Sequence, residues 1–169
     1  MTSDRFIVVT GGPGAGKTAL LTALADRGYA VTLEAGRALI RAGKTADDPV
    51  PFSDAILNWE TRSYVWALEQ SGTVFFDRGV PDVAGNWIAM GQPVPPHVEA
   101  AIAACPYNPH VLIAPPWREI YVHDEERKQP WETAVATYEV MVEAYTRYGY
   151  ELVELPRVTV VERVEFVLT

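Results

Sequence analysis

Apolar residues follow two spacings along this chain of 169 residues. Short β-rich apolar runs, bounded by Gly, Pro or polar residues, predict five strands. These runs occupy residues 6–10, 29–33, 73–79, 110–114 and 150–155. The stretches between them carry apolar residues at helical spacing, and strands that alternate with helices indicate a parallel sheet with helices on both faces. The predicted fold class is therefore α/β, with a five-stranded parallel sheet.

Start and stop signals divide the helical stretches. Helices are expected at about residues 17–27, 35–43, 53–70, 83–90, 131–148 and 160–168, and a further one ends at Ala104. Gly28 is a typical helix-ending glycine, and Ser53 is a typical N-terminal cap of the long third helix. The segment "KTADDPVP" before it indicates a polar loop broken by prolines. No internal repeat or low-complexity linker interrupts the pattern, so we expect a single domain over residues 1–169.

Composition narrows the class of partner. The formal net charge is −8 and no run of Lys or Arg occurs, which argues against binding to nucleic acid or to an anionic membrane. Cys105 is the only cysteine, so the sequence excludes an internal disulfide and a multi-cysteine metal site. The first residues lack a basic-then-apolar signal, and no apolar run approaches membrane-spanning length. We expect a cytoplasmic protein with no nucleic-acid or membrane partner.

A glycine-rich stretch connects the first predicted strand to the first predicted helix. Residues 11–18, "GGPGAGKT", fit the pattern G-x-x-x-x-G-K-[ST] in the strand–helix context that this pattern requires. Gly11, Gly14 and Gly16 let the backbone bend tightly, so that successive N–H groups can point at a bound phosphate. The new helix adds its own free N–H groups and the positive end of its dipole. The stretch therefore predicts a phosphate-binding loop.

Two side chains give this loop its chemistry. Lys17 would place a positive charge on the β- and γ-phosphates, and the Thr18 hydroxyl would be a ligand of Mg²⁺. The alternative is a glycine-rich turn that binds nothing, but the spacing, the lysine, the threonine and the context all agree. We expect ATP and Mg²⁺ as cofactors, with the choice between ATP and GTP left open.

Charged residues lie at the carboxyl end of the third predicted strand, at the edge of the sheet where ligands bind in such folds. Asp77 ends an apolar run and either holds Mg²⁺, directly or through water, or caps the following turn. The next residue is Arg78, where ring-forming ATPases usually present a second acid. The planar guanidinium of Arg78 suits a phosphate or carboxylate of a second substrate, and an ion pair with a neighbouring acid is the alternative.

Glu34 follows the second predicted strand and is expected to face the γ-phosphate across the cleft. There its carboxylate could accept a proton from an attacking hydroxyl or hold that hydroxyl in line. Arg37 lies one helical turn further on the same face and is a candidate substrate-binding residue. The alternative is a Glu34–Arg37 surface pair, or a glutamate placed at a helix N-terminus because the dipole favours it there.

Residues 115–130 are charged, aromatic and flanked by prolines, which predicts a short flexible lid. Arg118 and Arg127 are groups of the kind that stabilise charge on a transferring phosphoryl group. Trp117 and Trp131 bracket the segment and either stack on a base or anchor its ends.

Five stretches together carry a resemblance to a known family. They are "GGPGAGKT", "EAGR", "VFFDRGVPD", "PPWREIYVHDEERKQ" and "YELVELP". This combination resembles the small predicted ATPase or kinase family of P-loop proteins grouped under the AAA label. That family is also similar to the nicotinamide riboside kinase domain of bacterial NAD regulators and, more distantly, to thymidylate and deoxynucleoside kinases. The resemblance covers essentially the whole chain.

The resemblance implies a P-loop kinase-like fold in which the strand before Asp77 neighbours the strand before the phosphate loop. The resemblance also implies which residues contact the phosphates and Mg²⁺, namely Gly14, Ala15, Gly16, Lys17 and Thr18. It further implies an acceptor-side role for Glu34 and Asp77–Arg78, and a lid role for Arg118 and Arg127. No separate helical lid domain follows the core, unlike in ring ATPases, so the oligomeric state stays open.

The function that these patterns predict is an ATP- and Mg²⁺-dependent phosphotransferase. Its acceptor is the hydroxyl of a small polar metabolite, with nucleoside-like compounds as one option. In this hypothesis Lys17 and Arg127 offset developing charge, and Glu34 or Asp77 positions the hydroxyl. The alternatives are a nucleotide-hydrolysing regulatory switch that acts through a protein partner, and a nucleotide-binding module without turnover.

Overall fold

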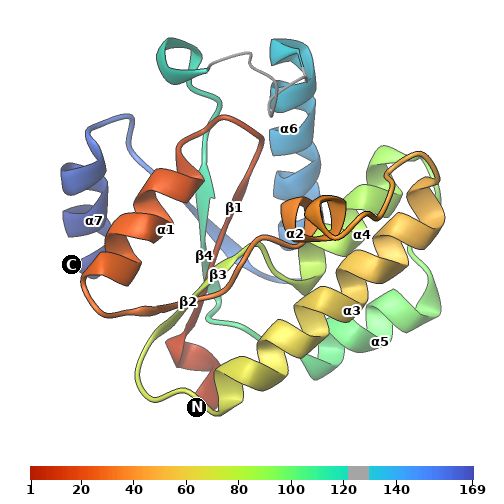
Figure 1. Cartoon of the computed structure of the whole chain (residues 1–169), viewed down its shortest axis with the longest axis horizontal. Helices are drawn as coiled ribbons and strands as arrows, with labels where there is room; N and C mark the ends of the chain where they lie inside the picture. The colour runs from red at the N-terminus through yellow and green to blue at the C-terminus, as the bar shows by residue number, and fades with distance from the viewer. Residues whose placement is uncertain (122–129) are drawn as a thin grey trace.

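Five parallel strands form one sheet in the computed structural model, which describes residues 1–121 and 130–169 (Figure 1). The order of the strands across the sheet is β2-β3-β1-β4-β5. They are β1 (Phe6–Gly11), β2 (Ala30–Val31), β3 (Val74–Asp77), β4 (His110–Ala114) and β5 (Glu151–Glu154). The predicted parallel α/β fold is confirmed, as is the pairing of the strand before Asp77 with the strand before the phosphate loop.

Helices cover both faces of this sheet. The α-helices of the described residues are α1 (Lys17–Asp26), α2 (Ala35–Arg41), α3 (Pro49–Leu68), α4 (Val80–Ala89), α5 (Pro96–Ala104), α6 (Trp131–Arg147) and α7 (Val160–Leu168). Short 3₁₀ helices are η1 (Thr2–Arg5) and η2 (Arg118–Ile120). In Figure 1, α1 and α7 lie together on one side of the strands, and α3, α4, α5 and α6 lie on the other.

The two central strands are apolar on both faces because each face is covered by helices. Along β1, Phe6 and Val8 belong to the core under α3–α6, whereas Val9 belongs to the core under α1 and α7. On β3, Phe76 and Phe75 divide between the same two cores. Such near-continuous apolar runs are typical of buried parallel strands. This packing fixes the carboxyl ends of β1 and β3, from which the phosphate loop and Asp77 emerge.

Three element boundaries differ from the sequence prediction. Helix α3 begins earlier than expected, because Asp48 and not Ser53 is its N-cap, accepting a hydrogen bond from the Val50 N–H (3.4 Å). Prolines fit the first helical turn, whose N–H groups have no helical partner, so the prolines expected to break a loop instead begin the helix. Ser53 is buried inside it. Similarly, α4 begins at Val80, before the predicted Val83.

The second strand is shorter than predicted, because the chain leaves the sheet edge after Val31. The Thr32 N–H still donates to the Phe75 carbonyl (2.9 Å), and the Thr32 hydroxyl accepts from the Asp77 N–H (3.0 Å). This contact ties the end of β2 to the end of β3. Within residues 1–121 and 130–169, no helix is both long and apolar enough to cross a membrane.

Candidate active site

One cavity of about 710 Å³ opens at the carboxyl ends of β1 and β3. The connections that leave β1 and β3 lead to opposite sides of the sheet, and ligands usually bind at such a switch point. One end is lined by the phosphate loop, residues 13–18, and the other by side chains of α2, α3, α4 and α6. The cavity therefore joins the predicted nucleotide loop to the predicted acceptor-side residues Glu34, Arg37, Asp77 and Arg78, all of which line it.

The phosphate loop is shaped by close contacts that only glycine tolerates. Gly14 and Gly16 have φ values of 70° and 84°, in the left-handed region that favours glycine. A Cβ on Gly14 would lie 2.6 Å from the Tyr121 ring. Gly11 instead ends β1 against Ala114 and does not line the cavity, so its contribution is to let the loop leave the sheet.

Arg163 supports the loop from α7 and was not singled out from the sequence. Its side chain is 2% exposed, and its Nη1 donates to the carbonyl of Ala15 (2.7 Å) while its Nε donates to the carbonyl of Pro156 (2.8 Å). The guanidinium also lies 5.0 Å from the Trp117 ring centre. Sequence patterns could not find this contact, because Ala15 and Arg163 are far apart in the chain.

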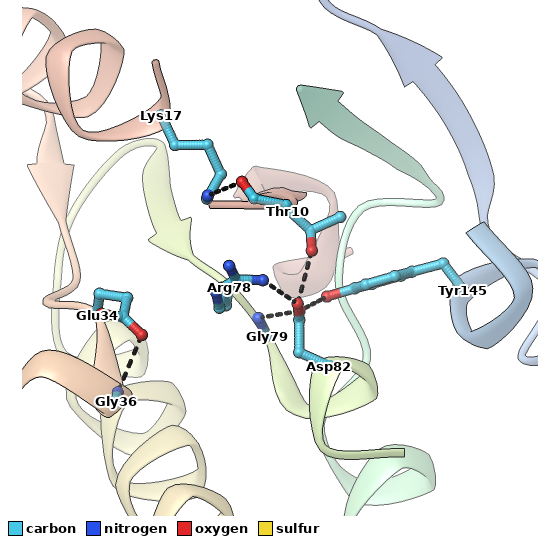
Figure 2. Close-up of polar contacts among 9 residues, drawn as sticks. Thr10, Lys17, Glu34, Gly36, Arg78, Gly79, Asp82 and Tyr145 are labelled. Atoms are coloured by element: carbon cyan, nitrogen blue, oxygen red, sulfur yellow. Dashed lines mark hydrogen bonds and ion pairs between the residues drawn. The ribbon is translucent and has the colours of Figure 1, made fainter. Parts of the chain in front are cut away.

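Lys17 is buried at the centre of the cavity, with its side chain directed back along the loop (Figure 2). Its Nζ donates to the carbonyl of Gly12 (3.0 Å). Burial, and then the positive charge of Arg78, lower the pKa of Lys17 to about 7, whereas Asp77 and Glu34 act in the opposite direction. A phosphate group here would restore the protonated form, because a nearby negative charge favours it.

Thr18 and Asp77 are the predicted Mg²⁺ ligands, and both line the cavity. Asp77 is 8% exposed, and its Oδ1 is buried without a hydrogen-bond partner in the structure described. Burial raises the pKa of Asp77, while Lys17 and Arg78 partly offset that effect. Among the described residues, no three His, Cys, Asp or Glu side chains group around one point. The donor set fits Mg²⁺, which binds through one or two protein oxygens together with substrate phosphates and water.

Asp82 organises the middle of the cavity and was also missed in the sequence analysis. Figure 2 shows four donors converging on its carboxylate. Oδ1 accepts from the Thr10 hydroxyl (2.6 Å) and Arg78 Nη1 (3.1 Å), and Oδ2 accepts from the Gly79 N–H (2.9 Å) and the Tyr145 hydroxyl (2.5 Å). Asp82 is 3% exposed, so these bonds replace the water that a carboxylate requires.

Arg78 is held in an unusual backbone conformation by this network. It is the only described non-glycine residue with positive φ, at 70°, and such strained residues gather at functional sites. The ion pair with Asp82, which the sequence left as an alternative, is present, and Arg78 also lines the cavity. The sequence did carry a signal for this pair, because Asp82 follows Arg78 by four residues at the start of a helix.

Glu34 caps the N-terminus of α2, as Figure 2 shows for one of its contacts. Its two carboxylate oxygens accept from the N–H groups of Gly36 and Arg37, both at 3.0 Å. Arg37 Nε lies 3.9 Å from Glu34 Oε2, so the predicted alternatives of a helix-terminal glutamate and a surface pair are both present. The capping contacts fix a carboxylate that also lines the cavity.

Of the predicted lid arginines, Arg118 does not line the cavity that the structure describes. Arg118 begins η2, and its guanidinium lies 5.0 Å from the ring centre of Trp131. It lines a separate hollow of about 380 Å³ beside Tyr121, the residue that contacts Gly14. Arg127 lies outside the described residues. Trp131 therefore anchors a segment next to the phosphate loop.

Glu60 on α3 is a further cavity residue that the sequence analysis did not identify. It is 1% exposed, and neither carboxylate oxygen has a hydrogen-bond partner in the described structure. Burial, followed by the negative charge of Asp82, raises the pKa of Glu60 well above its ordinary value. The signal was present, since Glu60 and Tyr64 are one turn apart on the buried face of α3.

Comparison with protein families matches residues 6–163 to the model of a family described as AAA domain. A search of curated proteins gives no match.

Solved structures share the fold. A crystal structure of NadR protein in complex with NR has a TM-score of 0.79 at 19% identity, covering 98% of this chain and 50% of that one. Deoxyadenosine kinase from M. mycoides has a TM-score of 0.68 at 13% identity, covering 96% of each chain. Thymidylate kinase from Ehrlichia chaffeensis has a TM-score of 0.63 at 16% identity, covering 97% of this chain and 98% of that one. The chain thus spans about half the length of the NadR chain and nearly all of the two kinases.

Proposed function

Because the chain belongs to the AAA domain family and has the fold of P-loop kinases, we propose that it is an ATP- and Mg²⁺-dependent phosphotransferase. The acceptor is the hydroxyl of a small polar, nucleoside-like metabolite. The observation that carries this proposal is that one continuous cavity has the phosphate loop at one end and buried acidic and basic side chains at the other. A protein that only hydrolysed ATP would not need the second half.

The nucleotide half would hold the phosphates through loop N–H groups of Gly14, Ala15 and Gly16 and through Lys17. Thr18 and Asp77 would hold Mg²⁺, which when bound neutralises charge between the β- and γ-phosphates. The unpaired Oδ1 of Asp77 supports this assignment. Arg118 and Arg127 remain candidates for contact with the nucleotide.

In the acceptor half, Glu34 would position the hydroxyl and Arg78 would bind a polar group of the acceptor, with Arg37 at the mouth. The acceptor oxygen forms a bond to the γ-phosphorus while the bond from that phosphorus to the bridging oxygen breaks, so that ADP leaves. The hydroxyl proton passes to a carboxylate oxygen of Glu34, with Asp77 as the alternative acceptor, and then to solvent.

The similar structures support a small-molecule acceptor, because NR is bound in the NadR structure and dCMP and dCDP are bound in the deoxyadenosine kinase structure. The net charge of −8 is in keeping with a small acceptor and with the prediction of a cytoplasmic protein without nucleic-acid or membrane partners.

ADP release tests the proposal. The protein with ATP and Mg²⁺ is screened against nucleosides, other small hydroxyl compounds and protein fractions, and each product is identified by mass spectrometry. The proposal predicts at least one small compound that accelerates ADP release and becomes phosphorylated. Acceleration by a protein fraction alone, with only inorganic phosphate formed, would replace it with the regulatory switch. The Lys17→Ala variant is the negative control for ADP release by the protein.

A further inference from the structure

Glu60 presents a buried carboxyl group to the cavity without an internal partner. Its side chain lines the cavity from α3, and both oxygens lack a hydrogen bond within the described structure. By contrast, the neighbouring buried acid Asp82 accepts four hydrogen bonds. Two acids of similar burial in one cavity therefore differ in whether the protein itself satisfies them.

The unpaired state of Glu60 is unfavourable for folding. A buried carboxyl group without hydrogen bonds loses its water and gains nothing in return. The charged groups that act on Glu60 are mainly acidic. Asp82 and Asp77 disfavour its ionised form, and Arg78 favours it. Since an apolar residue of similar size would avoid this cost, the acid is better explained by a partner that enters the cavity.

Apolar side chains flank Glu60 in the cavity. Phe52 and Ile56 precede it by two turns and one turn on α3, so the three lie in a line along the helix. Met141 of α6 lines the same cavity. A site with apolar sides and a small number of placed polar groups is the usual form of a pocket for a flat ring with polar substituents.

We infer that Glu60 selects the acceptor by accepting a hydrogen bond from an N–H group on its ring. The acceptor class is therefore a nucleoside-like compound that carries a carboxamide or amino group at the end remote from the phosphorylated hydroxyl. A carboxylate at that position is disfavoured, because it has no N–H to donate and because Asp82 and Asp77 oppose a further negative charge there. This inference rests on the proposed function for the location of the acceptor.

The test uses pairs of ribosides that differ in the donor. One pair is nicotinamide riboside and nicotinate riboside, and the neutral pair is adenosine and purine riboside, which lacks the amino group and has no N–H on its base. Dissociation constants are measured by calorimetry in the presence of Mg²⁺ and a non-hydrolysable ATP analogue. Within at least the neutral pair, we expect the N–H-bearing member to bind about tenfold more tightly or better, because its partner leaves a buried polar group unpaired.

Two variants separate recognition from structure. Glu60→Gln keeps an oxygen that can accept the N–H bond and should keep the preference, whereas Glu60→Met keeps the length of the side chain and should reduce the preference to about twofold or less. Affinity for the ATP analogue should not change in either. An equal affinity within both wild-type pairs, no binding of any of the four ribosides, or a full preference in Glu60→Met would overturn the inference.

A spectroscopic measurement keeps the test independent of the folding of Glu60→Met. The infrared carbonyl band of the Glu60 carboxyl, assigned by its loss in Glu60→Gln, should shift when adenosine binds but not when purine riboside is added. An unshifted band with bound adenosine would contradict the inference. If the binding preference is present but no riboside is phosphorylated, the proposed transfer reaction fails while the recognition by Glu60 stands.

Discussion

The two halves of the cavity are built in different ways. The proposed nucleotide half is lined by the consecutive residues 13–18, and the groups that we propose to bind phosphate are mostly backbone N–H groups between Gly14 and Thr18. The acceptor half is assembled from side chains on four helices, with buried acids at its centre. Backbone groups recognise a phosphate that every nucleotide has, whereas buried side chains can distinguish one acceptor from another.

The difference shows where specificity resides. A loop of backbone donors binds phosphate in many proteins, so its presence says little about the second substrate. In the acceptor half, Asp82 is fully satisfied by the protein and fixes Arg78, whereas Glu60 has no partner. We therefore expect mutations in the nucleotide half to affect every reaction of the protein, and mutations in the acceptor half to depend on the acceptor.

Lys17→Ala should have the largest effect. Loss of the charge on the transferring phosphoryl group should lower turnover by roughly 10²–10³-fold, because a preorganised donor to developing charge contributes on that scale. Steady-state kinetics of ADP release measures it, and circular dichroism checks the fold. The matched control is Lys44→Ala, at an exposed lysine outside the cavity. Unchanged turnover in folded Lys17→Ala protein would contradict the nucleotide assignment.

Removal of the metal should have a comparable effect through Asp77. Chelation by EDTA should abolish most turnover, since charge between the phosphates is then not neutralised. In Asp77→Asn, the Mg²⁺ concentration for half-maximal rate should rise by about tenfold or more, because a neutral amide is a weaker ligand for a hard cation. Mg²⁺ titrations at saturating ATP measure this. Equal rates with and without divalent metal are incompatible with the site.

Glu34→Gln tests the acceptor half while keeping one of the two contacts by which Glu34 caps α2. The amide keeps an oxygen for one α2 N–H but loses the negative charge, so turnover should fall by roughly 10²-fold while ATP affinity stays the same. Glu69→Gln, at the end of α3, is the control acid outside the cavity. A wild-type rate in Glu34→Gln would transfer the proton-accepting role to Asp77.

Asp82→Asn should act mainly on stability. It removes the charge that pairs with buried Arg78 and replaces one acceptor oxygen by a donor facing other donors, which should lower the free energy of unfolding by about 3 kcal/mol. Urea unfolding measures the change, with exposed Asp54→Asn as the control. A loss below about 1 kcal/mol would show that the network contributes little.

Glu60→Gln should change how the free energy of unfolding depends on pH. Because the pKa of Glu60 is raised in the folded state, folded protein binds more protons than unfolded protein above the ordinary Glu pKa, and wild-type stability falls as pH rises there. The advantage of Glu60→Gln over wild type should therefore grow by up to about 1.4 kcal/mol per pH unit, starting near the ordinary Glu pKa, until the raised pKa is reached. A constant difference between about pH 5 and about pH 8 in urea unfolding would contradict it.

The nucleotide half could be predicted from sequence because its residues are contiguous and carry a motif. The alternation of elements predicted the parallel sheet, the family resemblance implied the neighbouring position of β1 and β3, and the ends of the predicted strands placed Lys17 and Asp77 in the cavity. In contrast, Asp82 and Glu60 gain their meaning from helices packed across the sheet, which local patterns do not describe. The start of α3 was misplaced because prolines suit a first helical turn as well as a loop.

A label balance tests most directly whether both halves of the cavity act in one transfer. The protein is mixed with γ-³²P-labelled ATP, Mg²⁺ and the acceptor found by the ADP screen, and the label is followed in single turnovers. We predict that the label recovered in the phosphorylated acceptor equals the ADP formed, and that Glu34→Gln slows both equally. Label recovered in inorganic phosphate at the same rate with or without the acceptor would contradict the proposed phosphotransferase.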